Sequence, residues 1–369
     1  MNTKYDVIDA DGHVLEPVDF WRTYIDPSFR ERAPQLVVDE RGRTRLRVED
    51  RFVGAPQGIG MIGSLGVDRT GDITSFQYEE GRPGGFDPHA RIPDMDLDGI
   101  DAAFLYPSMG LYAGAIEDPE LAAACCRAYN RWIVEYCAPY PDRLFPVAML
   151  PMQSVDLAIT ELRYAREALG IRSGFVRPNQ YLGRNLGDPA YDPLWATAQD
   201  LDFPIGVHEG SGGMPSSVAD RFRTPGARHI CSHTMEMMLA CLSIIWEGVC
   251  ERYPRLRFAF LESGGGWVPG WLDRMDRHFA NKGVFDEAPL SMPPSDYFRR
   301  QCWISFEPVE QSLTYVVDYI GPRNILWATD YPHPDGFFPG APAMVAAKVP
   351  DTHRQAVLAG GAMAFYGLD

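Results

Sequence analysis

Four segments of the sequence place histidine or carboxylate side chains directly after a short apolar run. Asp11 and His13 follow the first run, and residues two apart on a strand project to the same side. Carboxylate and imidazole are ordinary ligands of zinc and similar divalent ions. Each segment alone is equally compatible with polar caps of turns or helices. The other three segments contribute His208 and Glu209, Glu262, and Asp330 and His333.

Alternating strands and helices are expected to position these side chains. Short continuous apolar runs are typical of parallel strands buried on both faces. The expected strands are Val7–Ala10, Ala102–Tyr106, Leu144–Met149, Ser173–Val176, Pro204–Val207, Leu256–Leu261, Cys302–Phe306 and Ile325–Thr329. Capping and periodicity predict helices between them, beginning after Asp118, Ser154 and Asp192 and spanning 235–253, 268–278, 311–320 and 353–366.

This alternation predicts a (β/α)8 TIM barrel, with a doubly wound open sheet as the alternative. We expect a single domain over residues 1–369. An insertion of about 27–95, after the first strand, should lie near the mouth of the barrel. A GxGxxG match at 58–63 falls inside this insertion, where no strand feeds a helix, so it predicts a loop rather than a dinucleotide site. Barrel active sites form at the carboxyl ends of the strands, where the four polar segments would converge.

The composition excludes several function classes. The 34 basic and 50 acidic residues give a net charge of −16, which argues against nucleic acid as a partner. Only three of the basic residues are lysines, so chemistry that depends on a lysine is poorly supported. No apolar stretch is long enough for a membrane span. Seven cysteines without a secretory signal indicate reduced thiols and a cytoplasmic protein.

The ordered combination of motifs resembles the amidohydrolase superfamily. The carriers of the resemblance are D-x-D-x-H after strand one, a lone histidine after strand five, S-G-G-G-W-x-P after strand six and T-D-Y-P-x-P after strand eight. The resemblance is to the branch of aminocarboxymuconate-semialdehyde decarboxylase and related aromatic-acid decarboxylases and hydrolases. It implies one divalent metal per chain, Zn²⁺ or alternatively Mn²⁺, held by Asp11, His13, His208 and Asp330.

Two departures from the family pattern affect the expected chemistry. Many decarboxylases of this branch have a histidine after strand six, and here that residue is Glu262. The binuclear members of the superfamily bridge two metals with a carbamylated lysine after strand four, and here that residue is Arg177, so one metal is expected. With the histidine missing, Glu262 or His233 would transfer the proton, together with Asp330.

The resemblance and the residue types give further expectations. Arg177, Glu16, His333 and Trp267 are expected to bind substrate, and a salt bridge to a barrel acid is the alternative for Arg177. The favoured function is a mononuclear metal-dependent hydrolase. It is expected to act, by metal-activated water, on a small carbonyl- or carboxylate-bearing substrate that is aromatic or derived from a ring. A non-oxidative decarboxylase and a non-catalytic metal-containing binding protein are the alternatives. By analogy with the family, the chain is expected to form a homodimer.

Overall fold

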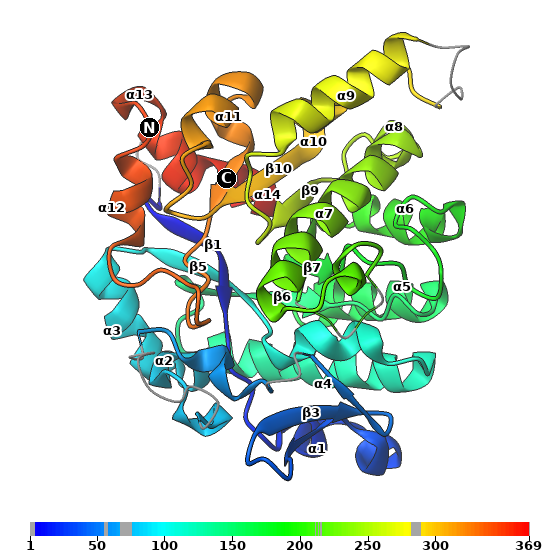
Figure 1. Cartoon of the computed structure of the whole chain (residues 1–369), viewed down its shortest axis with the longest axis vertical. Helices are drawn as coiled ribbons and strands as arrows, with labels where there is room; N and C mark the ends of the chain where they lie inside the picture. The colour runs from blue at the N-terminus through cyan, green and yellow to red at the C-terminus, as the bar shows by residue number, and fades with distance from the viewer. Residues whose placement is uncertain are drawn as a thin grey trace.

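Eight parallel strands form the central sheet of the computed structural model, which describes residues 4–54, 58–66, 76–210, 212, 214, 216–281 and 289–368. Their order along the sheet follows the chain, and His13 N–H donates to Tyr331 O at 2.7 Å where the sheet closes. The closed parallel sheet confirms the TIM barrel and excludes the open doubly wound sheet (Figure 1). The strands are β1 (Ile8–His13), β5 (Ala102–Tyr106), β6 (Leu144–Met149), β7 (Ser173–Val176), β8 (Ile205–His208), β9 (Phe258–Leu261), β10 (Cys302–Phe306) and β11 (Ile325–Trp327).

Helices cover the outside of the barrel. The predicted caps are present, because the Asp118 side chain accepts from Glu120 N–H and the Ser154 side chain accepts from Leu157 N–H. No helix of the described residues is long and apolar enough to cross a membrane. The helices after β5 are α4 (Pro119–Cys137), α5 (Val155–Arg163), α6 (Asp192–Asp200), α7 (Pro225–Trp246), α8 (Val249–Arg252), α9 (Val268–Ala280), α10 (Pro294–Gln301), α11 (Leu313–Ile320), α12 (Ala341–Ala346), α13 (Asp351–Gln355) and α14 (Gly361–Tyr366).

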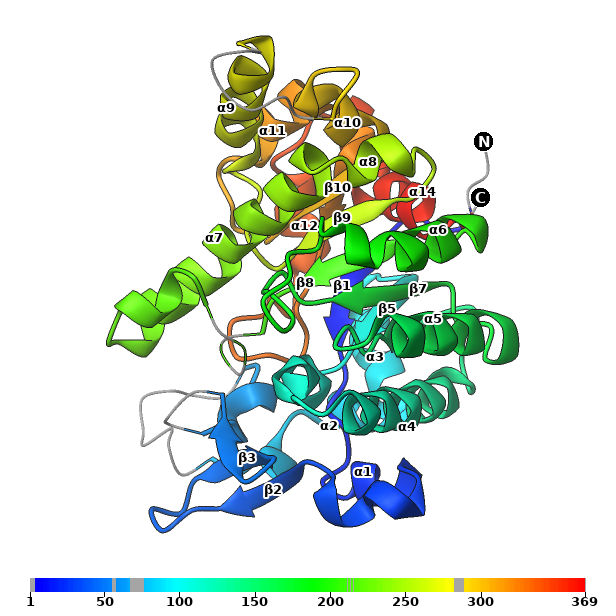
Figure 2. The same cartoon turned by 90° about the vertical axis from the view of Figure 1, so that its right-hand side faces the viewer.

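Helix α7 differs most from its predicted bounds. It begins at Pro225, ten residues before the predicted start, and Figure 2 shows that it extends well beyond the barrel. The start was missed because this first part of the helix is largely exposed and lacks an apolar stripe, although Thr224 and Pro225 occupy its N-cap and first position. His233 therefore lies within the helix and not at its N-terminus.

The insertion after β1 contains a small antiparallel sheet. Its strands are β2 (Gln35–Val38), β3 (Thr44–Val48) and β4 (Arg51–Val53), and short helices α1 (Phe20–Tyr24) and α2 (Pro83–Phe86) flank it. Leu65 N–H donates to Pro332 O, so the insertion contacts the segment after β11, near the mouth of the barrel. Its predicted end at 95 is too late, because α3 (Pro88–Asp98) is the helix that leads into β5.

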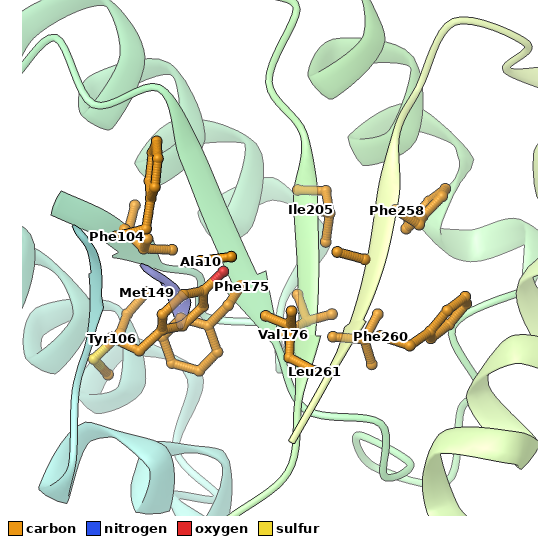
Figure 3. Close-up of a cluster of buried hydrophobic side chains, with 14 of the residues drawn as sticks. Ala10, Phe104, Tyr106, Met149, Phe175, Val176, Ile205, Phe258, Phe260 and Leu261 are labelled. Carbon is orange, nitrogen blue, oxygen red and sulfur yellow. The ribbon is translucent and has the colours of Figure 1, made fainter. Parts of the chain in front are cut away.

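The barrel interior is packed with large apolar side chains. Inward-facing residues of neighbouring strands fill it, including Phe104, Phe175 and Leu261 (Figure 3). Tyr106 and Tyr366 pair their hydroxyl groups at 2.8 Å, and Tyr366 also donates to Ala10 O, so the buried hydroxyls are satisfied. This packed interior fixes the strand ends on which the polar segments sit.

Candidate metal centre and active site

Polar atoms from four strand ends form an arc at the carboxyl end of the barrel. Along it, Glu262 Oε2 lies 3.3 Å from His208 Nε2, which lies 3.2 Å from Asp11 Oδ1. His13 Nε2 continues the arc, 3.6 Å from Asp11 Oδ1 and 3.4 Å from Asp330 Oδ1. All five atoms are buried, and none makes a hydrogen bond of acceptable geometry within the described residues, although Asp330 Oδ1 also lies 2.8 Å from His333 Nδ1. Buried polar atoms normally have hydrogen-bond partners. A cation bound by these atoms would account for their lack of hydrogen bonds.

Backbone carbonyls orient the two histidines of the arc. His13 Nδ1–H donates to Pro107 O at 2.9 Å, and His208 Nδ1–H donates to Glu209 O at 2.5 Å. Each bond orients its ring so that Nε2 faces the arc, the usual arrangement of a metal-ligating histidine. Burial also lowers the pKa of His13 well below its usual value, which keeps that ring neutral.

The two aspartates of the arc, Asp11 and Asp330, have raised pKa values. Burial raises the pKa of Asp11 to about 6. Burial and the nearby negative charges of Glu262 and Asp335 raise the pKa of Asp330 well above its usual value. Glu262 and Asp330 also have left-handed backbone conformations, with φ of 47° and 52°, which non-glycine residues adopt rarely and often at functional sites. A divalent cation would relieve the repulsion among these acids.

Glu262 links the arc to His233 on α7. Its Oε1 atom lies 3.4 Å from His233 Nε2, and His233 Nδ1 contacts His229 O at 3.0 Å. Burial alone would lower the pKa of His233, but the charge of Glu262 raises it to about 9. Although burial opposes ionisation of Glu262, the charge of His233 holds the pKa of that carboxyl well below its usual value. At neutral pH the pair is therefore a buried ion pair facing the arc.

The remaining predicted substrate ligands are placed differently from expectation. Arg177 is buried and donates to Glu209 Oε1 at 2.9 Å and to Leu111 O at 2.7 Å, which is the salt-bridge alternative. Glu16 accepts from Ser108, Met109 and Gly110 N–H and holds the loop after β5. These contacts are structural, and neither side chain lines the cavity beside the arc.

Trp267 and His333 also lie away from the cavity wall. Trp267 is the residue before α9 and packs edge-on against Phe260, with ring centroids 6.2 Å apart. His333 stacks on His13 and contacts Asp330, so it holds these two side chains of the arc in position. A direct substrate contact of either residue therefore stays a prediction.

The cavity beside the arc has a volume of about 290 Å³. Its wall contains four of the predicted site residues, namely Asp11, His233, Glu262 and Asp330. Its wall also contains residues that the sequence analysis missed, namely His229, Ser305, Phe306, Glu307, Glu310, Asp335 and Phe337. The strand-end rule applied to β10 points to Glu307, and the spacing of four residues from His233 on one helix face points to His229.

A closed parallel barrel with nitrogen and oxygen ligands at its strand ends defines a metal-dependent barrel enzyme. The family model described as Amidohydrolase matches residues 8–368, so the chain belongs to this family. Within it, the chain lies in the branch of the aminocarboxymuconate-semialdehyde and γ-resorcylate decarboxylases.

Individual relatives and solved structures agree with this placement. The chain is 26% identical to a 2-amino-3-carboxymuconate-6-semialdehyde decarboxylase of Dictyostelium discoideum, over 77% of each chain. It is 29% identical to a γ-resorcylate decarboxylase of Polaromonas sp., over 66% of this chain and 76% of that one. An amidohydrolase structure from Mycobacterium avium subsp. paratuberculosis superposes with a TM-score of 0.81 at 23% identity, covering 99% of this chain and 100% of that chain.

A dihydroxybenzoic acid decarboxylase structure from Polaromonas sp. contains manganese and the inhibitor 2-nitroresorcinol. It superposes with a TM-score of 0.66 at 19% identity, covering 99% of this chain and 97% of that chain. These structural likenesses support the barrel fold. The two sequence relatives named above are both decarboxylases and not hydrolases.

Proposed function

We propose that the protein is a non-oxidative, divalent-metal-dependent decarboxylase of a small aromatic or unsaturated acid. The observation that carries this proposal is the arc of partnerless buried ligand atoms beside the His233–Glu262 ion pair. The named decarboxylase relatives support the same reaction class. This reaction class differs from the hydrolysis that the sequence favoured.

The residues present fit a divalent ion. Asp11, His13, His208 and Asp330 would hold it, as the orphaned Oδ1 and Nε2 atoms indicate. Mn²⁺ is the ion we propose first, because a related structure contains manganese, and Zn²⁺ is the second candidate. When bound, the ion supplies charge stabilisation for a substrate carboxylate and for the electron-rich system left as CO2 departs.

The chain's own residues would supply the proton and the binding surface. His233 is protonated at neutral pH and faces the cavity, so its Nε2–H can donate the proton that replaces CO2 on the substrate carbon. Glu262 holds the ring in place and stabilises its charge until transfer. Phe306 and Phe337 offer apolar surface for a planar substrate. His233 regains its proton from solvent after product release.

Hydrolysis remains the second candidate because of Glu262. A carboxylate with a lowered pKa suits a base better than an acid, and a base is what activation of a water molecule needs. Under this mechanism Glu262, not His233, would be the first proton carrier.

A panel of hydroxybenzoates, unsaturated acids, esters and amides, assayed separately for CO2 and for hydrolytic products, tests these functions. Release of CO2 that depends on added Mn²⁺ is the expected result. Hydrolytic products without CO2 would replace the proposal by the second candidate. Metal binding without turnover of any member would favour a binding protein.

We also propose a single-domain homodimer, located in the cytoplasm. Support for the dimer comes from apolar side chains on and just before the projecting part of α7, where Ile230 is 70% exposed and Phe222 and Met235 are also exposed. Sedimentation at micromolar concentration tests it, and a monomer would reject the dimer alone.

A further inference from the structure

The Oε2 atom of Glu262 has the same surroundings as the ligand atoms of the arc. It is buried, lies 3.3 Å from His208 Nε2 and has no hydrogen-bond partner within the described residues. Asp11 Oδ1 flanks the same nitrogen at 3.2 Å and is equally without a partner. A buried carboxylate oxygen without a hydrogen bond is costly, so Oε2 of Glu262 needs a positively charged partner, as Oδ1 of Asp11 does.

The two oxygens of Glu262 are engaged in different directions. Oε1 is 3.4 Å from His233 Nε2, whereas Oε2 faces His208. The carboxylate therefore lies between His208 and the proton donor His233. The ion pair with His233 needs only one of the two oxygens of Glu262. Support of His233 as the general acid therefore does not account for the position of Oε2 beside His208.

The backbone at Glu262 is held in the conformation that produces this placement. Glu262 and Gly264 both have positive φ, 47° and 65°. Gly265 N–H donates to Glu310 Oε2 at 2.9 Å, and a Cβ at Gly265 would come within 2.1 Å of Phe306, so the chain must pass this point as glycine. Left-handed backbone at a glutamate persists only where its surroundings fix it.

We infer that Glu262 is a fifth protein ligand of the metal through Oε2, and that its Oε1 joins the metal centre to His233. The ligand set then holds two imidazole nitrogens and three carboxylate oxygens. A set with more than four ligands and mostly oxygen suits Mn²⁺ better than tetrahedral Zn²⁺. The inference rests on the metal site of the proposed function, but not on the reaction that the enzyme catalyses.

Metal-stripped protein and its variants are titrated with Mn²⁺, and free Mn²⁺ is measured by its electron paramagnetic resonance signal. Glu262→Gln is expected to weaken binding on the order of 100-fold or more, as loss of a charged ligand should. His233→Asn removes the partner of Oε1 but no ligand, so its effect should stay within about threefold. Glu307→Gln, an acid of the same cavity outside the arc, is the matched control and should also stay within about threefold.

If Glu262 merely positions His233, the Glu262→Gln and His233→Asn variants will bind Mn²⁺ alike, and the inference is overturned. Two Mn²⁺ ions per chain would also overturn it, because the His229–His233–Glu262 group would then hold its own ion. A crystal structure of the Mn²⁺-loaded protein gives the direct measurement. An Oε2 to metal distance of about 2.2 Å is expected, and one beyond about 3 Å rejects the inference. Absence of any metal binding by the wild-type protein would reject the metal site itself, and this inference with it.

Discussion

His333 stacks on His13 across the closure of the barrel, with ring centroids 3.9 Å apart and planes inclined by 26°. The Nδ1 atom of His333 lies 2.8 Å from Asp330 Oδ1, and its Nε2 atom pairs with Ser108 Oγ at 2.8 Å. Burial lowers the pKa of His333 to about 4, so the ring is neutral. The stacked ring thus fixes the positions of one histidine and one carboxylate of the metal centre.

Replacing His333 by alanine should therefore weaken the metal site without abolishing it. Residues that orient metal ligands typically contribute about 10- to 100-fold in metal affinity, and we expect His333→Ala to fall in this range. Isothermal titration of the metal-stripped protein with Mn²⁺ measures the change. A raised KM with unchanged metal affinity would instead show that His333 binds substrate directly.

Replacing His208 by alanine should remove most of the metal. The variant loses one nitrogen ligand in the middle of the arc, next to Asp11. We expect about one divalent ion per wild-type chain and less than about a tenth of that in the variant after dialysis, by elemental analysis. His353→Ala, on α13 and away from the cavity, is the control and should keep its metal. Full metal content in His208→Ala would exclude this residue from the site.

Replacing His233 by asparagine should stop proton transfer and leave the metal in place. Loss of a positioned acid costs about 10²- to 10⁴-fold in turnover, and we expect kcat to fall by that factor with KM little changed. Steady-state CO2 release, normalised to metal content, measures this. Turnover near the wild-type rate would show that another group, and not His233, is the proton donor.

The His233–Glu262 pair should make the metal-free protein less stable at high pH. The pKa of His233 is raised from its ordinary 6.5 to about 9. Its contribution is therefore fully present below the unfolded pKa and is lost as the pH rises through about 9. We expect the free energy of unfolding, measured in urea with a chelator, to fall on the order of 1–3 kcal/mol between pH 6.5 and 9.5. His233→Asn should flatten this dependence of stability on pH. An equally steep fall in that variant would show that another titrating group causes the loss.

Breaking the buried Arg177–Glu209 pair should cost stability and leave metal content unchanged. Glu209→Gln leaves Arg177 buried without a countercharge, and such losses are typically about 3–5 kcal/mol. Chemical denaturation measures the change. Glu167→Gln breaks the exposed pair with Arg163 and should change stability by less than about 1 kcal/mol. If the Glu209→Gln variant is as stable as the wild type and has a higher KM, Arg177 binds substrate, as the sequence predicted.

The local sequence was sufficient for the strands and for the residues at their ends. Continuous apolar runs mark strands buried on both faces, and each was expected within a few residues of its observed bounds. The first part of α7 and the helix α3 were missed because their surfaces lack the apolar stripe by which a helix is recognised from sequence. The family motifs pointed to Asp11, His13, His208 and Asp330 before any distance was known.

The order of these residues around the arc was decided only by the closed barrel. His13 and Asp330 are 317 positions apart in the chain, and closure of the sheet between β1 and the segment after β11 brings them together. Likewise, only the packing of α7 against the strand ends pairs Glu262 with His233 and leaves Oε2 to face His208. Residue types and local spacing determine which groups can do chemistry. Their distances depend on strand register and helix packing, which are set by contacts between segments remote in sequence.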